Sequence, residues 1–254
     1  MSFMELTAQP SWQAVDFISD LHLQASEPGT SNAWQRYMQT TPADAVFILG
    51  DLFEVWVGDD VLQERGFERQ CAQVIKQTAT RTPVFFMHGN RDFLVGAAMM
   101  AAADAALLSD PTVFIFHNQR WLLSHGDALC VDDTPYMQFR QLVRSAPWQQ
   151  AFLAKPLAQR QAIARSLRQQ SEANKQMTTH YADVDTHAAR QALGKANSAT
   201  LIHGHTHKPG VHNLGKDMQR MVLSDWDASA TPPRAQVLRL SAQGVQRISL
   251  ASLN

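Results

Sequence analysis

The sequence predicts an α/β fold, because short apolar runs of strand length alternate with segments of helical character along the first half of the chain. Each run ends directly in polar residues or glycine, and the interval 135–180 departs from this pattern. Alternating strands and helices are typical of a sheet with crossover connections, in which functional groups collect at the carboxyl ends of the strands. The fold class therefore also predicts where a site should lie.

The first three strands are expected at residues 15–19 (VDFIS), 45–49 (AVFIL) and 83–87 (PVFFM), which are short and mainly apolar runs of strand length. The segments between them, about 31–40 and 63–80, have the composition and spacing of helices. Such a strand-helix-strand order predicts parallel pairing of the three strands.

The second half of the chain predicts a hairpin, a further helix and more strands. The hairpin strands are expected at 113–117 and 121–125, with a turn at 118–120, and a helix at about 185–195 leads to a strand at 200–203. The tail contains short apolar runs that we interpret as β-structure closing a second sheet, at residues 221–224, 236–240 and 245–250.

The interval 135–180 predicts a helical segment, because it contains no convincing strand and its apolar residues recur at helical spacing. It holds seven basic residues against one acid, Glu172. Two interpretations remain open: a solvated helical subdomain, or a helical cap that binds an anionic or amphipathic substrate.

The composition is that of an ordinary globular protein, with 45% hydrophobic and 18% charged residues. A formal net charge of −1 gives no overall indication of nucleic-acid binding. Cys71 and Cys130 lie far apart in the sequence, which argues against a disulfide scaffold and fits a reducing cytoplasm. Residues 1–12 have no signal-peptide pattern and are expected to be an extension before the first strand. The most apolar stretch, 95–108, is too short to span a membrane.

Four of the ten histidines lie in LIHGHTHKPGVH, residues 201–212. Imidazoles two positions apart in an extended chain, as at His205 and His207, point to the same side. This spacing favours metal ligation over packing or nucleic-acid contact, provided that carboxylates lie nearby. His212 lies beyond this pair and is expected to be structural.

Carboxylate partners are available at the other strand ends. The polar ends of the predicted strands are Asp20-Leu21-His22, Gly50-Asp51, Gly89-Asn90-Arg91-Asp92, His125-Gly126-Asp127 and Gly204-His205-Thr206-His207. Together they offer carboxylates, imidazoles and an amide, the mixed oxygen and nitrogen set that suits a pair of Mn, Fe or Zn ions.

The order and spacing of these blocks resemble the calcineurin-like metallophosphoesterase superfamily, with its D-x-H, G-D, G-N, H and G-H-x-H motifs from Asp20 to His207. The resemblance implies an αββα sandwich of two sheets, with a core at 13–134 and 181–254 and a helical cap at 135–180. It implies two metal sites that share Asp51. The first would be held by Asp20, His22, Asp51 and His207, and the second by Asp51, Asn90, His125 and His205.

GNRD at 89–92 has Arg91 where many members of the superfamily have histidine, and this difference narrows the resemblance to one family within it. With GDLFEVWVGDD, SHGDALCVDD and HGHTHKPGVH, it is similar to the family of diphosphatases that act on UDP-2,3-diacylglucosamine in lipid A biosynthesis. The resemblance implies two Mn²⁺ ions that activate a hydroxide for attack on the α-phosphorus, giving UMP and 2,3-diacylglucosamine 1-phosphate. It also implies a peripheral enzyme on the cytoplasmic side of the inner membrane, with no nucleic acid and no obligate protein partner.

The roles implied for individual residues are catalytic, substrate-binding or supporting. Arg91 is expected to stabilise phosphate charge, and its alternative is a salt bridge to Asp92 or Asp127. Asp92 and Asp127 are expected to hydrogen-bond the ligand histidines. The other residues implied are, for catalysis, Asn90 and His203, and for substrate binding Asn90, Arg91, Asp133, Tyr136, Arg168, Ser171, Asn174, Lys175 and His205.

Apolar cap residues are possible walls for acyl chains, although packing within the cap is the default explanation for each: Trp148, Phe152, Leu153, Leu157, Ile163 and Leu167. Two rival functions remain. One is a metallophosphoesterase that acts on another phosphodiester, a phosphoprotein or a nucleotide, and the other is a metal-stabilised binding protein without turnover.

Overall fold

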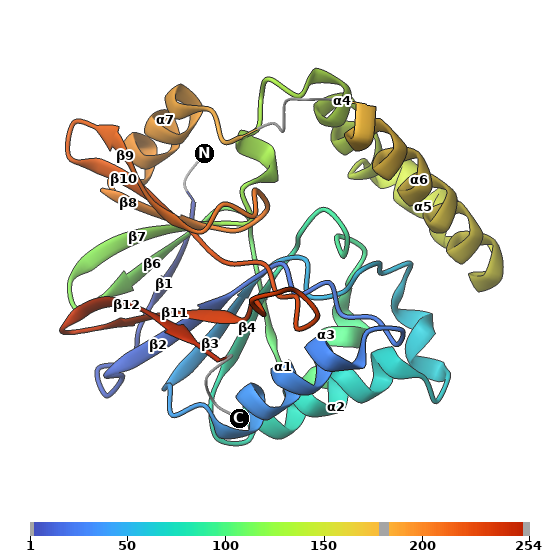
Figure 1. Cartoon of the computed structure of the whole chain (residues 1–254), viewed down its shortest axis with the longest axis horizontal. Coiled ribbons are helices and arrows are strands. Elements are labelled where there is room, and N and C mark those ends of the chain that lie inside the picture. The colour runs from blue at the N-terminus through green and yellow to red at the C-terminus, as the bar shows by residue number, and fades with distance from the viewer. Residues whose placement is uncertain (1–2, 178–182, 251–254) are drawn as a thin grey trace.

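Two six-stranded sheets are stacked face to face between layers of helices, as the sequence predicts (Figure 1). The computed structural model describes residues 3–177 and 183–250, and the side chains of 3–168 and 183–250. The strand orders are β12-β11-β2-β3-β4-β5 and β1-β6-β7-β8-β10-β9. The α/β class and the two-sheet architecture are therefore confirmed.

The first sheet combines four parallel strands with an antiparallel hairpin from the tail. Its strands are β2 (Ala14–Ile18), β3 (Ala45–Leu49), β4 (Val84–Met87), β5 (Ala106–Leu108), β11 (Gln236–Ser241) and β12 (Gly244–Ser249). Its connections contain α1 (Pro28–Thr40), η1 (Asp59–Gln63), α2 (Phe67–Ala79) and α3 (Ala97–Ala103). β2 and β3 are almost completely buried, because helices cover one face and the second sheet covers the other.

The second sheet is mixed and has one helix packed on it, α7 (Thr186–Ala196). Its strands are β1 (Met4–Thr7), β6 (Thr112–Phe116), β7 (Gln119–Ser124), β8 (Thr200–His203), β9 (Gly210–Gly215) and β10 (Met218–Val222). β7 and β8 are parallel neighbours, so their carboxyl ends lie together. A short helix, η2 (Asp127–Leu129), follows β7 directly.

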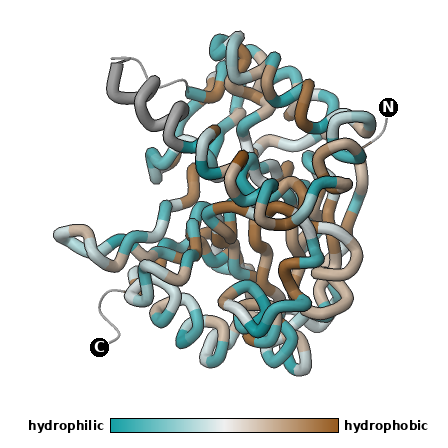
Figure 2. Tube along the Cα trace, turned by 90° about the vertical axis from the view of Figure 1, so that its right-hand side faces the viewer, coloured by the Kyte–Doolittle hydropathy of each residue, from teal (hydrophilic) through white to brown (hydrophobic). Residues whose placement is uncertain are grey.

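The two sheets meet through aromatic side chains. Phe47 stacks on Phe17 with ring centroids 5.0 Å apart, and it lies 4.8 Å from Phe114 of the second sheet. Burial of rings of this size is a large share of the stabilising free energy of such a core. Figure 2 shows the same organisation, with hydrophobic residues concentrated in the interior strands and mixed polarity along the outer helices.

The helical segment expected at 135–180 consists of α4 (Thr134–Val143), α5 (Ala146–Leu153) and α6 (Leu157–Met177), which lie together at one side of the molecule (Figure 1). We call these three helices the cap. Trp148 stacks on Phe152 at 4.7 Å and lies 6.3 Å from Phe93 of the core, so aromatic packing joins cap and core. Leu153 and Leu167, by contrast, remain exposed.

Several local expectations were wrong. Residues 4–7 form β1, an exposed edge strand paired with β6, rather than an extension before the first strand. The hairpin turn is His117-Asn118, both with positive φ, so residues 119 and 120 belong to β7. The tail does not close one sheet: β10 joins the second sheet and the β11–β12 hairpin joins the first. Elements α3, β5 and β9 were not expected.

No helix among the described residues is both long and apolar enough to cross a membrane.

Candidate metal centre and active site

The five polar blocks converge, because the carboxyl ends of strands from both sheets meet at one edge of the sandwich. Asp20, Asp51 and the G-N block follow β2, β3 and β4 of the first sheet, while His125 and the G-H-x-H block follow β7 and β8 of the second. Five side chains of these blocks leave a backbone with positive φ: Asp20, His22, Asp51, His205 and His207. Such conformations are uncommon outside glycine and cluster at functional sites, where the surrounding structure maintains them.

One group of polar atoms comprises Asp20, His22 and His207. His22 Nε2 lies 3.3 Å from His207 Nε2, and His207 Nε2 lies 3.3 Å from Asp20 Oδ1. The backbone N–H of His205 donates to both oxygens of Asp20, at 3.1 and 2.9 Å, and so fixes this carboxylate. Two imidazole nitrogens facing each other beside a carboxylate are arranged as the ligands of a shared cation.

A second group comprises Asp51, Asn90, His125 and His205. Asn90 Oδ1 lies 2.9 Å from His125 Nε2 and 2.8 Å from His205 Nδ1, and His125 Nε2 lies 3.7 Å from Asp51 Oδ1. His125 Nδ1 lies 2.9 Å from the carbonyl oxygen of Leu49, an arrangement that assigns the proton to Nδ1 and leaves Nε2 as the ligand atom.

The two groups are adjacent. One ligand atom each from Asp20, Asp51 and His125 lies within 4.8 Å of the others. The seven residues implied as metal ligands therefore gather at one edge of the sandwich, where Asp51 lies beside Asp20 and His125. That Asp51 serves both metal sites stays a prediction.

Two glycines allow this close approach. A Cβ atom on Gly89 would lie 2.1 Å from Asp51 Oδ1, and one on Gly204 would lie 2.2 Å from Asp20 Oδ2. Any side chain at these two positions would displace a carboxylate of the site, which is why glycine precedes both the asparagine and the histidine pair.

The electrostatics of the cluster suit a bound cation. Burial, with the nearby charge of His125, lowers the pKa of His205 to about 3, so that this imidazole is neutral. Burial opposes protonation of His125 too, but the carboxylates of Asp51, Asp20 and Asp127 raise its pKa to about 9. Carboxylates that stabilise a proton in a buried site also stabilise a metal ion that replaces it. The donors present therefore form a site for divalent metal.

Asp92 supports the site through the backbone, not through a ligand histidine as expected. Its carboxylate accepts the backbone N–H groups of Gly89 at 2.8 Å, Leu52 at 2.8 Å and Asp51 at 3.3 Å. These bonds tie the loops after β3 and β4 to each other. Burial and the neighbouring charge of Asp51 raise the pKa of Asp92 to about 7.

Asp127 also has other partners than those expected. It is fully buried, and its Oδ2 accepts the hydroxyl of Tyr136 at 2.6 Å and Nε of Arg140 at 2.8 Å. Arg144 Nη2 lies 3.6 Å from the same oxygen. All three partners lie on α4 or directly after it, so Asp127 joins the cap to the segment that follows β7 and contains His125.

Arg91 lies at the edge of the metal cluster and pairs with neither Asp92 nor Asp127, the two acids considered from the sequence. Its Nη1 donates to Glu54 at 2.9 Å, and its Nε lies 3.6 Å from Asp51 Oδ2. About a fifth of the side chain, 22%, is exposed. The guanidinium is therefore held beside the cluster by two acids and remains accessible.

Some implied substrate contacts come from the cap. Tyr136 stacks on His205 with ring centroids 5.9 Å apart, and Asp133 accepts the backbone N–H of Tyr136 at 3.1 Å as the N-cap of α4. Arg168 of α6 forms an ion pair with Glu54. The side chains of Ser171, Asn174 and Lys175 lie outside the described part of the structure.

The other two histidines of LIHGHTHKPGVH are His203 and His212, and neither belongs to the two ligand groups. His203 is completely buried at the end of β8, where its Nδ1 lies 2.8 Å from the carbonyl oxygen of Gly204 and its Nε2 lies 3.4 Å from Arg220. Burial lowers the pKa of His203 to about 4. His212 lies on β9, with its Nε2 3.3 Å from the carbonyl oxygen of Lys208.

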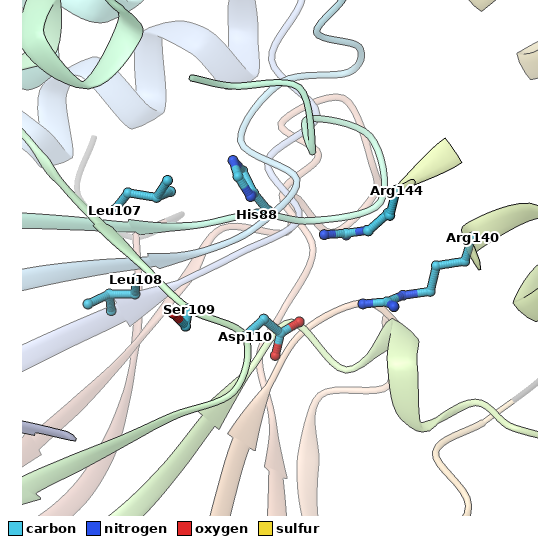
Figure 3. A pocket seen from close by; sticks show the side chains of 7 residues that line it. All are labelled: His88, Leu107, Leu108, Ser109, Asp110, Arg140 and Arg144. Atoms are coloured by element: carbon cyan, nitrogen blue, oxygen red, sulfur yellow. The ribbon is translucent and has the colours of Figure 1, made fainter. Parts of the chain in front are cut away.

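A cavity of about 270 Å³ lies between the cap and the core beside this centre (Figure 3). Arg140 and Arg144 reach into it from α4 and its end, opposite His88 and Asp110 (Figure 3). Arg144 Nη2 donates to the carbonyl oxygen of Gly89 at 2.8 Å. The cavity thus borders the residues that support the ligands rather than the ligand atoms.

Glu54 was missed at the sequence level. It is buried, 8% exposed, and its carboxylate lies next to His22, Arg91 and Arg168. One signal was available, since Glu54 is the lone acid between Asp51 and Asp59 in an otherwise apolar stretch, LFEVWVG. A single acid in such a run is buried only with partners, but the sequence does not say which partners.

The chain is similar to a known protein family and to curated proteins with a shared name. The sequence model described as calcineurin-like phosphoesterase matches residues 14–209. A UDP-2,3-diacylglucosamine hydrolase of Chromobacterium violaceum is 46% identical over 246 residues, which cover 94% of this chain and 100% of the relative. The protein of the same name from Bordetella pertussis is 40% identical over 251 residues, 95% of each chain. A solved archaeal phosphodiesterase aligns with a TM-score of 0.46 and 12% identity, over 93% of this chain and 99% of that one.

Proposed function

We propose that this chain, which belongs to the calcineurin-like phosphoesterase family and within it to the UDP-2,3-diacylglucosamine hydrolases, hydrolyses the diphosphate bond of UDP-2,3-diacylglucosamine. The products are UMP and 2,3-diacylglucosamine 1-phosphate, and the reaction is a step of lipid A biosynthesis. The observation that carries this proposal is the pair of adjacent ligand groups with an accessible arginine at their edge.

Two Mn²⁺ ions are the proposed cofactors. Asp20, His22, Asp51 and His207 would hold one ion, and Asp51, Asn90, His125 and His205 would hold the other. When bound, the ions neutralise phosphate oxygens and lower the pKa of a water that serves as nucleophile. Convergence of imidazole nitrogens on one another and on the amide oxygen of Asn90 supports this assignment.

The chain's own residues orient and stabilise the reacting diphosphate. Arg91 presents further N–H donors beyond those directed at Glu54 and Asp51, so it binds the oxygens of the phosphate under attack. Cleavage at the α-phosphorus breaks its bond to the bridging oxygen, and that oxygen leaves on the lipid phosphate. The leaving phosphate is already stable as an anion, so charge stabilisation by Arg91 contributes more than a general acid does. His203, buried behind the ligands, supports the G-H-x-H loop.

The cap supplies recognition of the lipid substrate in this proposal. Tyr136 and Asp133 at the start of α4, with Arg168, Ser171, Asn174 and Lys175 of α6, contact the glucosamine phosphate. Exposed apolar side chains of the cap, such as Leu153 and Leu167, support contact with acyl chains. The basic residues of the cap would also favour an anionic membrane surface, which supports a proposed peripheral location on the cytoplasmic side of the inner membrane.

Incubation of the Mn²⁺-loaded protein with UDP-2,3-diacylglucosamine tests the proposal, with bis(4-nitrophenyl) phosphate as a generic diester. We expect release of UMP and the lipid monophosphate in equal amounts. Hydrolysis of the aryl diester without UMP release would instead indicate a phosphoesterase with another substrate. Turnover of neither compound by a metal-loaded, folded protein would indicate a binding protein.

A further inference from the structure

Glu54 is a buried acid beside the proposed metal site to which the assignments above give no role. It lies in the loop that follows β3, and its backbone N–H donates to the carbonyl oxygen of Leu23 at 3.1 Å. The preceding residue, Phe53, forms an isolated β-bridge with Leu23. The backbone of Glu54 is therefore fixed against the loop that carries His22, which gives its carboxylate a defined position.

The two oxygens of this carboxylate face different parts of the site. Oε2 lies 3.5 Å from Nδ1 of His22. Oε1 accepts Nη1 of Arg91 at 2.9 Å and also pairs with Arg168 of the cap. A buried carboxylate is costly unless cations or hydrogen-bond donors surround it, and here all three neighbours belong to the proposed site.

The His22 contact has the arrangement of an outer carboxylate behind a metal ligand. His22 Nε2 faces His207 Nε2 at 3.3 Å, so Nε2 is the nitrogen on the cluster side. The other ring nitrogen, Nδ1, is buried and makes no hydrogen bond within the described part of the chain, and the Glu54 carboxylate lies beside it. Metal-ligating histidines commonly donate their second N–H to a carboxylate, which fixes the tautomer and the ring orientation.

The Arg91 contact determines which donors of the guanidinium are free. Nη1 is directed at Glu54, and Nε lies near Asp51 at 3.6 Å. This leaves Nη2 without a protein partner among the residues whose side chains are described. Without Glu54, the guanidinium would be free to turn fully onto Asp51, where it would compete with a metal for the same oxygens.

We propose that Glu54 is a positioning residue that couples the two halves of the centre. Through Oε2 it orients the His22 ring for metal binding, and through Oε1 it holds the Arg91 guanidinium toward the phosphate. Arg168 brings α6 of the cap to the same oxygen, so the position of α6 and the alignment of Arg91 both depend on the Glu54 carboxylate. The part of this inference that concerns phosphate rests on the proposed function, whereas the part that concerns metal does not.

The test uses Glu54→Gln and Glu54→Asp in the full chain, with Glu64→Ala as the matched control. Glu64 is an acid of the same region that is exposed to solvent. Mn²⁺ affinity is measured by titration calorimetry, and kcat and KM are measured with the lipid substrate and with the aryl diester. Because loss of an outer carboxylate commonly lowers metal affinity or activity about 10- to 100-fold, we expect losses of that size in Glu54→Gln and partial recovery in Glu54→Asp.

A double-mutant cycle tests the arm that acts through Arg91. We expect Glu54→Gln to lower kcat much less in an Arg91→Lys background than in the wild type, because the partner it positions has already changed. Equal effects in both backgrounds would overturn this arm. Wild-type Mn²⁺ affinity and kcat in Glu54→Gln, even with a lowered melting temperature, would overturn the whole proposal, since a purely structural ion pair gives that result.

The design also separates this proposal from the proposed function. If the wild type releases no UMP, the lipid substrate is wrong. Mn²⁺ affinity and the aryl-diester kcat then still decide the role of Glu54, because neither depends on the lipid.

Discussion

The metal centre and the cap are held in place by different means. Ligand side chains of the centre leave strand ends whose loops are joined by backbone hydrogen bonds, for example from His205 to Asp20 and from Gly89 to Asp92. The described ion pairs that join the cap to the core run between side chains, such as Arg140 with Asp127 and Arg160 with Asp60. The chemistry is therefore built on loops joined by backbone hydrogen bonds, and recognition is assigned to a part whose position depends on side-chain contacts, both charged and aromatic.

The largest effect should come from a change inside the centre. Asp51→Ala removes the carboxylate that we propose serves both metal ions and that lies beside Arg91, so we expect kcat to fall by about three orders of magnitude or more, as for groups that act as one unit. Circular dichroism should remain that of the wild type, because the backbone bonds from Asp92 persist. The rate of UMP release measures this loss of kcat. Turnover near the wild-type rate would show that Asp51 does not bridge the sites.

A smaller effect is expected at the joint between the two regions. Asp127→Asn keeps the shape of the side chain but removes the charge opposite Arg140 and Arg144. Loss of charge-assisted hydrogen bonds of this kind costs about 1.5 to 3 kcal/mol, and a looser cap should raise KM for the lipid on the order of tenfold. KM for the small aryl diester should change little.

The matched control for Asp127→Asn is Asp132→Asn, a change at an exposed acid that lies between η2 and α4. It should behave as the wild type toward both substrates. If Asp127→Asn impaired the two substrates equally, Asp127 would belong to the centre rather than to the attachment of the cap.

The smallest effect is expected at Asp110, on the core side of the cavity that faces the cap. Its Oδ1 accepts Ser124 Oγ at 2.6 Å, while its Oδ2 is buried without a hydrogen bond in the described part of the chain. Burial and the charge of Asp127 raise its pKa above the ordinary value of 3.8. The folded state therefore binds this proton more tightly than the unfolded state, and stability declines as the pH rises from about 4 through the raised pKa.

Asp110→Asn should remove that decline and leave the protein as stable as the wild type at acidic pH, and by about 1 kcal/mol more stable at neutral pH. Urea denaturation at a series of pH values measures this difference. A variant that lost stability at neutral pH would show that the Asp110 charge has a stabilising partner.

The sequence predicted the centre better than its surroundings, for a physical reason. A buried strand is a mainly apolar run, and polar residues mark its end. The strand ends at Asp20, Asp51 and His125 could therefore be recognised from the neighbouring sequence alone. The partners of Asp92, Asp127 and Glu54 depend on which side chains face them across the fold, and no local pattern specifies that. β1 escaped prediction because it is an exposed edge strand whose pairing with β6 spans about a hundred residues.

Anomalous diffraction at the manganese edge, from crystals of the Mn²⁺-loaded protein, tests the central claim most directly. The account predicts two peaks: one within ligand distance of Asp20, His22, Asp51 and His207, and one within ligand distance of Asp51, Asn90, His125 and His205. Asp51 should contact both ions, and neither ion should contact the cap. A single peak, or a peak whose ligands come from the cap helices, would contradict the assignment of the chemistry to the strand ends.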